Sequence, residues 1–390
     1  MDMSILVEPE DRYSRLKLIE WWNQKVLSEA RVMVIGCGAL GNEVLKNLAL
    51  VGVGHILLVD FDMIEVSNLS RSALFRLSDQ HKSKAEVASA RVKELNPDIK
   101  TLALRKDIRW EIGIGLYRKL DVVIGCLDSR EARLAVNQAC WRVGVPWIDG
   151  GLQELLGSMR VFIPPEGACY ECTLSETDFQ QLNERYSCSL LQRKELADLI
   201  PTTPISASII GALQVQEVLK ILHHLRESAL QPGSGIFFNG FTNTVELIRY
   251  QRGELCLNHE RFENILALPI GVRTTTLRGL LEIARNHLGE GANVEIYREI
   301  VTDFDCPRCG YKRPVFKPLP SLSEQDGRCP RCGADCLPLM THCFTGNEPF
   351  LDLSLADVGI PPLEIVHARN RDRSLFLELG GDAEDILAFE

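Results

Sequence analysis

The sequence predicts an α/β protein whose core is a doubly wound, mostly parallel sheet. Two observations lead to this prediction. An apolar strand, a glycine-rich turn, a helical pattern and a second apolar strand follow one another between residues 31 and 60, which is the order of a βαβ unit. Further apolar runs then alternate with helical patterns up to residue 148, as is typical of a parallel sheet covered by helices. The expected fold is therefore Rossmann-like.

The same patterns place the individual elements along the chain. An amphipathic stretch over residues 12–29 predicts an N-terminal helix. The strands of the parallel sheet are expected at 31–35, 56–60, 101–104, 121–125 and 145–148, with intervening helices that include 82–95 and 130–142. From residue 158 onward, the stretches 159–163 and 235–250 are expected to extend the sheet as antiparallel strands, with a long apolar helix over 205–225 between them.

Composition and charge exclude several classes of protein. The chain has 390 residues and a formal net charge of −10, whereas a general nucleic-acid binder carries a basic face. No uncharged apolar run approaches the ~20 residues of a membrane span, and the N-terminal Met1-Asp2-Met3-Ser4 is unlike a signal peptide. We therefore expect neither a nucleic acid nor a membrane as a partner.

The cysteines indicate metal sites rather than disulfides. Six of the thirteen cysteines fall in three C-x-x-C pairs, and Cys256 begins a C-x-x-H sequence. Both spacings are typical of metal ligands, so a reducing, cytoplasmic compartment is expected. Two of the pairs are identical C-P-R-C-G knuckles, which predict a zinc ribbon. Its expected ligands are Cys306, Cys309, Cys329 and Cys332. The nearby Cys336, His342 and Cys343 remain unassigned.

These patterns also divide the chain. The main domain is expected to span residues 1–260. A connector with a helix at 277–287 and one strand follows over 261–305, then the zinc ribbon over 306–345. A small strand-rich segment over 346–390 completes the chain.

The glycine turn after the first strand is suited to binding phosphate. Gly36, Gly38 and Gly41 permit a tight turn and a close approach of phosphate to the free N–H groups at the start of the following helix. Asp60 ends the second strand, where a Rossmann fold places the carboxylate that binds ribose hydroxyls. Taken alone, this turn equally fits an NAD-dependent oxidoreductase.

The residues that follow distinguish this chain from a dehydrogenase. The segment from Asp60 to Arg71 reads D-F-D-M-I-E-V-S-N-L-S-R, and Lys84 follows it. Together with an R-Y-S-R stretch that ends at Arg15 and G-C-L-D-S-R around Asp128, it resembles the ubiquitin-activating superfamily of ThiF, MoeB and HesA type. This superfamily includes the adenylyltransferases of thiamine and molybdopterin biosynthesis. The resemblance covers roughly residues 11–260.

The resemblance implies ATP-dependent adenylation of the C-terminal carboxylate of a small protein. Negative charge accumulates on phosphoryl oxygens in this reaction, so the site needs cations and magnesium rather than a base. Arg71 and Lys84 are suited to bind the triphosphate, and Asn68 to hydrogen-bond it. Asp128 is suited to hold Mg²⁺, while Asp62 either assists the metal or only holds the loop.

The family also implies a twofold assembly. Arg15 resembles the arginine finger that one subunit of a family dimer contributes to the other's active site. One chain carries both the finger and a full site, so a homodimer is expected.

A second zinc site follows from the family resemblance. Cys169 and Cys172 form a knuckle-like pair, and in the family a second pair follows the last strands of the domain. Here that position is occupied by Cys256 and His259, so the family's cysteine has become a histidine. Zinc accepts three thiolates and one imidazole tetrahedrally, so the site is expected to persist.

Cys188 is the candidate nucleophile. It lies in the polar segment Glu-Arg-Tyr-Ser-Cys-Ser, downstream of Cys172, where ubiquitin-activating enzymes carry their catalytic cysteine on a crossover loop. Arg185 could lower its pKa and favour the thiolate that attacks an acyl-adenylate. The alternative is an ordinary loop cysteine.

Three functions remain open. The first is activation of a ubiquitin-like protein with a C-terminal glycine, thioester formation on Cys188 and transfer to a conjugating enzyme. The second is adenylation of a sulfur-carrier protein, and the third is a non-catalytic binding subunit. The joint presence of all the site residues disfavours the third. Sulfur-pathway relatives often append a rhodanese domain, whereas residues 261–390 hold a zinc ribbon, which favours the first.

Overall fold

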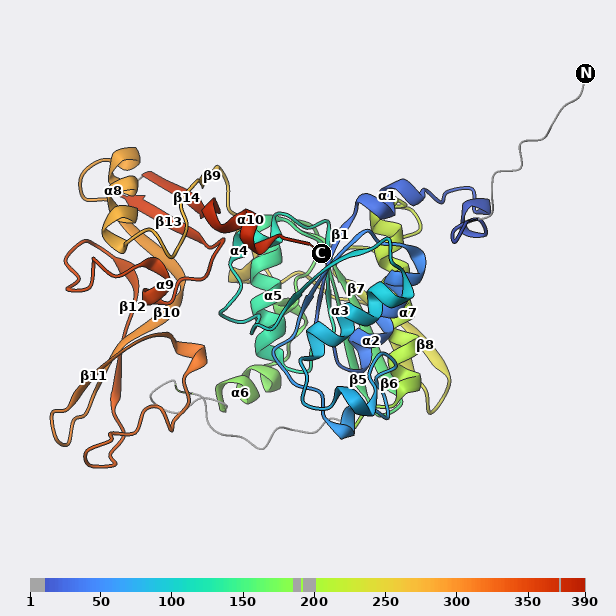
Figure 1. The fold of residues 1–390 in the computed structure, drawn as a ribbon, viewed down its shortest axis with the longest axis horizontal. Coiled ribbons are helices and arrows are strands. Elements are labelled where there is room, and N and C mark those ends of the chain that lie inside the picture. Colours follow the sequence, from blue (N-terminus) through green and yellow to red (C-terminus); the bar gives the residue numbers. More distant parts are fainter. Residues whose placement is uncertain (1–10, 185–190, 192–200, 372, 390) are drawn as a thin grey trace, which may run out of the picture.

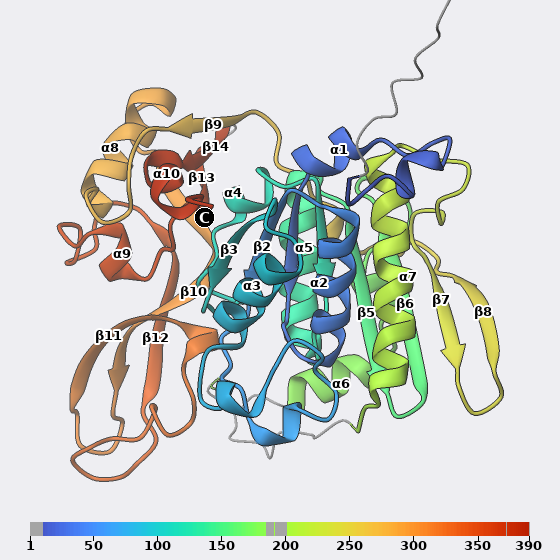
Figure 2. The ribbon, with the colours of Figure 1, turned by 45° about the vertical axis from the view of Figure 1, so that its right-hand side comes forward.

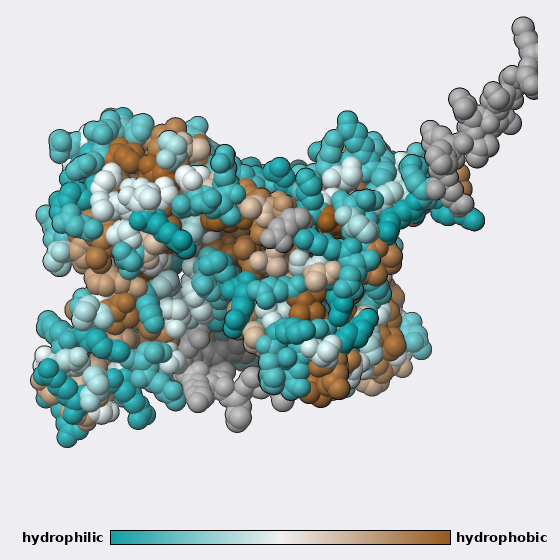
Figure 3. Space-filling model, viewed as in Figure 1, coloured by the Kyte–Doolittle hydropathy of each residue, from teal (hydrophilic) through white to brown (hydrophobic). Residues whose placement is uncertain are grey.

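The computed structural model describes residues 11–184, 191, 201–371 and 373–389. The chain forms a large α/β domain followed by a smaller C-terminal sheet that packs beside it (Figure 1). Hydrophilic residues cover most of the face shown in Figure 3, as expected for a chain in which 25% of residues are charged.

The predicted N-terminal helix over 12–29 is wrong in extent. Only two short pieces form, the 3-10 helix η1 (Leu16–Leu18) and the helix α1 (Gln24–Glu29). Asn23 is extended and its side chain accepts a hydrogen bond from the amide of Lys25, so it caps α1 as a separate helix. Leu18 is 80% exposed. Leu27 of α1 is fully buried in the core, whereas the stretch around Leu18 is exposed and lacks the tertiary packing that stabilises most helices.

The main sheet confirms the predicted topology. Its strand order is β3-β2-β1-β4-β5-β6-β7-β8, in which the first five strands in this order are parallel and the remaining three are added antiparallel. The strands are β1 (Arg31–Ile35), β2 (His55–Val59), β3 (Lys100–Leu104), β4 (Val122–Gly125), β5 (Trp147–Gln153), β6 (Leu156–Phe162), β7 (Ser234–Asn239) and β8 (Thr244–Arg249).

Helices cover both faces of this sheet because successive buried side chains of its central strands alternate between the faces. Val32 and Val34 of β1 pack on one side against α2 (Ala39–Val51), α3 (Lys84–Leu95) and α7 (Pro204–Leu222) (Figure 2). Met33 and Ile35 pack on the other side against α4 (Ile114–Tyr117) and α5 (Arg130–Val143). The short helix α6 (Glu176–Glu184) lies between β6 and α7 in the chain.

The helix α7 is long and apolar enough to cross a membrane by length and composition. In this structure half of that stretch is buried, and the helix packs on α2, β5 and β6. The amide of Gln214, which is fully buried, donates to the backbone oxygens of Gly125 (2.9 Å) and Ile148 (3.2 Å). These contacts are those of a core helix that joins two strands of the sheet.

Strands from all three C-terminal segments pair in one sheet. Its order is β11-β10-β13-β14-β9, and β12 also pairs with β10. The strands are β9 (Ile265–Leu268), β10 (Asn293–Asp305), β11 (Lys312–Pro318), β12 (Leu337–Phe344), β13 (Ile365–Asn370) and β14 (Arg373–Leu379). The helices are α8 (Leu277–Leu288), α9 (Leu355–Val358) and α10 (Ala383–Ile386). The long strand β10 joins the expected connector to both the ribbon and the tail.

Short 3-10 helices connect several of these elements. They are η2 (Val66–Asn68), η3 (Leu77–Asp79), η4 (Glu171–Thr173), η5 (Leu257–His259), η6 (Leu319–Ser321) and η7 (Gly380–Asp382).

The C-terminal sheet packs on the main domain through buried apolar and charged contacts. Leu363 and Ile365 are fully buried in the same apolar cluster as α4 and α5. The carboxylate of Glu378, which is 1% exposed, forms ion pairs with Arg118 and with Lys119 of the main domain. The two parts therefore share one core.

Candidate active site

The glycine turn has the close contacts that exclude side chains. Gly36 has φ +90°, and a methyl group there would lie 2.4 Å from the backbone oxygen of Cys126. A methyl group on Gly41 would lie 1.9 Å from the backbone oxygen of Gly36. A methyl group on Gly38 would meet nothing within 4 Å. The turn is thus closed on its protein side and open at Gly38, which is the N-cap residue of α2 and lines the cavity.

Asp60 supports this turn from the end of β2. Its carboxylate accepts hydrogen bonds from the amides of Cys37 (2.6 Å) and Asp62 (2.8 Å). Burial raises the pKa of Asp60, while Lys84 and these two amides oppose the rise. Asp60 therefore fixes the two loops that border the site.

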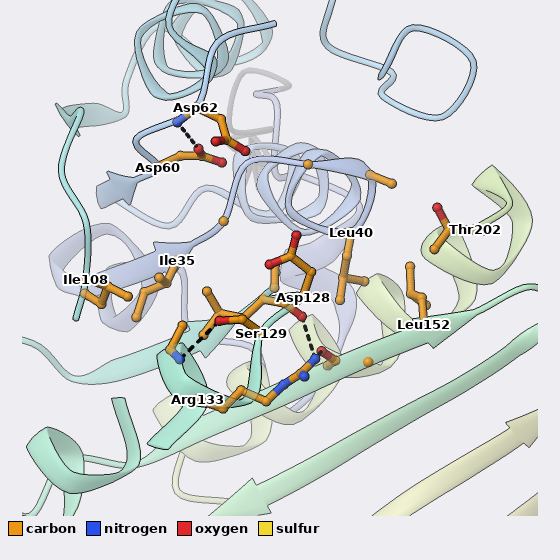
Figure 4. Close-up of a pocket in the computed structure, with 18 of the residues that line it drawn as sticks. Ile35, Leu40, Asp60, Asp62, Ile108, Asp128, Ser129, Arg133, Leu152 and Thr202 are labelled. Carbon is orange, nitrogen blue, oxygen red and sulfur yellow. Dashed lines mark hydrogen bonds between the residues drawn. The ribbon is translucent and has the colours of Figure 1, made fainter. Parts of the chain in front are cut away.

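A cavity of about 670 Å³ opens at the carboxyl ends of the parallel strands (Figure 4). This is the edge at which open α/β sheets bind ligands. The cavity gathers most of the residues predicted to bind nucleotide. They are Gly36, Gly38, Asp60, Asp62, Asn68, Arg71, Lys84 and Asp128. Gly41 lies behind the turn and shapes it without lining the cavity.

Lys84 begins α3 and points back to the loop after β2. Its Nζ donates to Asp62 Oδ2 at 2.7 Å, and its side chain is only 12% exposed. Burial lowers the pKa of Lys84, but the carboxylates of Asp60, Asp62 and Asp128 outweigh it and leave the pKa raised. Lys84 therefore stays protonated and provides a fixed positive charge.

Asn68 and Arg71 are held by the short helix η2 and the turn that follows it. The Asn68 side chain accepts a hydrogen bond from the amide of Glu65 (3.0 Å), which closes a capping box. The Arg71 guanidinium donates to the backbone oxygen of Ser67 at 2.9 Å. These bonds leave further donors of both side chains for a ligand.

Asp128 stands on the opposite wall of the cavity. It lies three residues after the end of β4, is exposed, and points toward Asp60 and Asp62 across the cavity (Figure 4). Carboxylate oxygens on both walls match the oxygen ligands that Mg²⁺ prefers, so the residues fit this ion. Asp62, on the wall opposite Asp128, pairs with Lys84.

The structure adds two arginines that the sequence did not single out. Arg133 of α5 lines the cavity, and its Nε donates to Asp149 Oδ1 at 2.8 Å. Arg160 of β6 also lines the cavity and donates to the Thr173 hydroxyl at 3.2 Å. The sequence hinted at Arg133 only through its place in the helix that follows Asp128. The ion pair with the buried Asp149, which the sequence does not reveal, directs the Arg133 side chain to the cavity.

One predicted catalytic residue lies away from the cavity, and another is outside the described residues. Arg15 is exposed on the N-terminal segment and is absent from the cavity lining of its own chain. Cys188 lies outside the described residues, so its role stays a prediction.

The predicted zinc knuckles do come together. The Sγ atom of Cys169 lies 3.7 Å from that of Cys172 and 3.6 Å from that of Cys256, and Cys172 Sγ lies 3.4 Å from His259 Nε2. Burial and the neighbouring Arg252 lower the pKa of His259, so its imidazole is neutral and able to bind metal. The four side chains fit a tetrahedral metal ion such as zinc.

The ribbon cysteines form a second group of four. The Sγ atoms of Cys306 and Cys332 lie 3.5 Å apart, and those of Cys309 and Cys329 lie 3.6 Å apart. Burial raises the pKa of Cys329, but backbone amides and neighbouring thiols outweigh it and lower the pKa to about 6. At neutral pH this cysteine is therefore a thiolate, the form that binds zinc.

The unassigned neighbours of the ribbon are not part of this group. Cys336 is buried beside it, and the ring of His342 lies 2.8 Å from a carboxylate oxygen of Glu299. The thiol of Cys343 accepts a hydrogen bond from Asn293 at 3.4 Å.

Comparison with known proteins decides the family. Residues 11–258 match the ThiF family, which is more than half of the chain. The chain belongs to the ThiF family. The match covers the main domain and ends before the C-terminal sheet begins at β9.

Curated relatives in this family include two kinds of activating enzyme. The chain is 30% identical over 249 residues to the sulfur carrier protein ThiS adenylyltransferase of Escherichia coli, covering 63% of this chain and 93% of that protein. It is 30% identical over 238 residues to ubiquitin-like modifier-activating enzyme 5 of Dictyostelium discoideum, covering 56% of this chain and 61% of that protein. It is 32% identical to the adenylyltransferase and sulfurtransferase MOCS3 of Mus musculus. That match covers 62% of this chain and half the length of MOCS3.

Solved structures of the same fold include MccB of Escherichia coli. Its complex with succinimide has a TM-score of 0.52 and 25% identity, covering 64% of this chain and 74% of MccB. Its complex with ATP has a TM-score of 0.53 and 24% identity, and the match covers 65% of this chain and 75% of MccB. The ThiF fold of the main domain is therefore shared with a protein crystallised with ATP.

Proposed function

We propose that this chain uses ATP to adenylate the C-terminal carboxylate of a small protein of the ubiquitin-like or sulfur-carrier class. The observation that carries the proposal is the single cavity that places Asn68, Arg71 and Lys84 opposite Asp128, beside the glycine turn. The relatives named as ubiquitin-like and sulfur-carrier activating enzymes support the same reaction.

In this reaction, a carboxylate oxygen of the carrier protein bonds to the α-phosphorus of ATP. The bond between that phosphorus and the bridging oxygen to the β-phosphate breaks, and pyrophosphate leaves. The turn at Gly38 offers backbone N–H groups to the phosphates, and Asp60 offers a carboxylate to the ribose. Lys84 and Arg71 stabilise the negative charge that develops on the phosphoryl oxygens.

A divalent metal belongs to this proposal. Asp128 is the residue that would hold Mg²⁺, which when bound supplies positive charge to the phosphate oxygens. The two cysteine clusters would hold Zn²⁺ as structural ions.

The next step separates the two carrier classes. In the favoured function, the Cys188 thiolate attacks the acyl carbonyl, a thioester forms and AMP leaves, and a conjugating enzyme then accepts the acyl group. The alternative is a sulfur-carrier adenylyltransferase, which is supported by the coverage of 93% of the ThiS-specific relative. We also propose a cytoplasmic homodimer in which Arg15 acts on the partner's site.

The test is ATP–pyrophosphate exchange with a candidate ubiquitin-like protein, together with a non-reducing gel of the wild type and Cys188→Ala. Exchange in both proteins with a thiol-sensitive adduct only in the wild type supports the favoured function. Exchange without an adduct supports the sulfur-carrier alternative. Absence of exchange with every glycine-terminated carrier would overturn the proposal.

A further inference from the structure

The chain that follows β3 forms one wall of the nucleotide cavity. Four consecutive residues line the cavity there, Lys106, Asp107, Ile108 and Arg109, which together are called the loop 106–109. Ile108 belongs to the same apolar cluster as Ile35 of β1, which also lines the cavity (Figure 4). An apolar surface of this kind suits the base of a nucleotide, whereas the charged groups of the cavity suit its phosphates.

The loop 106–109 is tied to the two residues that follow it, Trp110 and Glu111. The amide of Asp107 donates to a carboxylate oxygen of Glu111 at 2.7 Å, and the amide of Glu111 donates to the backbone oxygen of Asp107 at 3.0 Å. The Arg109 guanidinium donates to the Asp107 carboxylate at 2.7 Å, and its Cζ atom lies 4.2 Å from the centre of the Trp110 ring. The loop and Trp110 therefore form one unit, and a shift of Trp110 would move the cavity wall.

Arg298 of β10, in the C-terminal sheet, holds this unit in place. Its Nη1 atom donates to the backbone oxygen of Trp110 at 2.6 Å. Its Nη2 atom forms an ion pair with Glu364, and the Arg298 side chain is only 14% exposed. The Glu364 carboxylate also accepts a hydrogen bond from the amide of Ile114 at 3.3 Å. Arg298 and Glu364 therefore hold the backbone of the main domain at two points, Trp110 and Ile114.

The backbone next to these points fits closely against the C-terminal sheet. A methyl group on Gly113 would lie 2.3 Å from the backbone oxygen of Pro362. Gly113 has an ordinary extended backbone with φ −75°, so close packing and not backbone conformation excludes a side chain there. The amide of Gly115 donates to the backbone oxygen of Leu363 at 2.8 Å. The segment 110–115 is therefore fixed relative to the C-terminal sheet.

We propose that Arg298 is a positioning residue for ATP binding, through which the C-terminal sheet fixes the shape of the loop 106–109. The inference rests on the proposed function. Arg298 is not among the described residues that line the cavity, so it acts through the Trp110 carbonyl and does not touch ATP. Its expected effect is on the affinity for ATP and not on the chemical step. A sheet that lies beyond the ThiF match thereby gains a role in the reaction.

Arg298→Lys separates this role from a general effect on stability. A guanidinium donates to a carbonyl and to a carboxylate at the same time in a fixed geometry, whereas a lysine ammonium is a compact charge on a flexible stem. The lysine therefore keeps a positive charge beside the buried Glu364 and loses the fixed hydrogen bond to Trp110. Arg369→Lys is the matched control, because Arg369 is 50% exposed and pairs with Glu295 of the same C-terminal sheet. Thermal unfolding verifies that both variants are folded.

The first measurement does not depend on activity. Amide hydrogen exchange over residues 105–115 is followed by mass spectrometry in the full-length wild type and both variants, without nucleotide. Exchange in Arg298→Lys is expected to be about tenfold faster than in the wild type, because a charge-assisted hydrogen bond that restrains this segment is lost. Arg369→Lys is expected to exchange like the wild type. Wild-type exchange in Arg298→Lys would overturn the proposal.

The second measurement connects the loop to the reaction. In ATP titrations and in ATP–pyrophosphate exchange, Arg298→Lys is expected to weaken ATP binding and to raise the KM for ATP about tenfold each, with kcat within about twofold of the wild type. An unchanged ATP affinity, or a lower kcat at unchanged KM, would overturn the proposal. Failure of the proposed function has a different signature. No protein would then catalyse pyrophosphate exchange, while the difference in ATP affinity would remain and would support the positioning role.

Discussion

At the scale of single residues, the nucleotide site is a balance of opposite charges. Lys84 is nearly buried and lies within the influence of Asp60, Asp62 and Asp128. These carboxylates keep the lysine protonated in the absence of nucleotide. A triphosphate brings further negative charge to the same place, so a cation that is already oriented reduces the reorganisation needed in the transition state.

This arrangement predicts the effect of removing the charge. Lys84→Met is expected to lower ATP–pyrophosphate exchange by about 100-fold or more, because one oriented donor is lost where charge develops. Lys82→Met is the matched control. Lys82 lies two residues earlier, is 57% exposed and pairs with Asp79 outside the cavity. Equal loss in both variants would contradict a specific role for Lys84.

Gly38 and Gly41 of the turn are expected to respond differently to alanine. Gly41→Ala places a methyl group 1.9 Å from a backbone oxygen, so it should destabilise the protein by about 3 kcal/mol or more. Gly38→Ala meets nothing within 4 Å, so it should fold normally and weaken ATP binding roughly tenfold. Thermal unfolding and ATP titration distinguish the two effects. A Gly38→Ala protein with reduced stability and unchanged ATP affinity would contradict this interpretation.

At the scale of elements, the first cysteine cluster holds a short helix against the active site. Cys169 and Cys172 flank the start of η4, and the Thr173 hydroxyl in η4 accepts a hydrogen bond from Arg160 of the cavity. The amide of Tyr170 donates to the buried Asn137 of α5 at 2.8 Å. The first metal site is therefore joined to the nucleotide site by hydrogen bonds. The ribbon makes its apolar contact with Leu191 instead.

Because the two cysteine clusters have different neighbours, removing zinc from each cluster is expected to have a different effect on ATP binding. The purified protein should contain about two zinc ions per chain, and Cys172→Ser and Cys309→Ser should each remove one. Cys172→Ser should also weaken ATP binding, because η4 and Arg160 lose their support. Cys309→Ser should leave ATP binding unchanged. Elemental analysis and ATP titration give both quantities, and a chain that holds no zinc would contradict the assignment of both clusters.

At the scale of the whole molecule, the C-terminal sheet is part of one folded unit with the ThiF domain. Phe262 stacks on Phe376 with ring centroids 4.3 Å apart, and Arg142 of α5 lies over the ring of Tyr297 at 4.0 Å. Glu364 is 2% exposed, and its carboxylate accepts a hydrogen bond from the amide of Ile114 of the main domain at 3.3 Å. Separating the two sheets would expose this apolar surface and these charges to water.

The buried ion pairs predict a strong mutational effect at this interface. Glu378→Gln leaves Arg118 and Lys119 facing a neutral group, and breaking such a buried pair costs about 3 kcal/mol. Glu299→Gln is the control, because its partner His342 is 57% exposed and surface pairs contribute little. Calorimetry should show a lower Tm only for Glu378→Gln. Equal Tm values for the wild type and Glu378→Gln would show that this ion pair does not stabilise the interface.

Several features of the molecule were set by local sequence alone. The glycine turn, the alternation of strands and helices, and the two pairs of C-P-R-C-G cysteines are short-range patterns, and the structure confirms the elements and clusters they predict. They succeed because backbone conformation and ligand spacing depend on neighbouring residues. The helix predicted over 12–29 is wrong in extent, because an uninterrupted helix also needs tertiary packing along its length and Asn23 instead caps α1 as a separate helix.

The tertiary structure alone decided which distant segments meet. Cys169 and Cys256 lie 87 residues apart and come into contact only because β6, β7 and β8 return the chain to the same edge. The same holds for the C-terminal sheet, whose long strand β10 joins three segments that looked separate, and for Leu191 in the ribbon. The physical reason is that strand pairing and core packing depend on the fit between whole surfaces, which a local pattern does not encode.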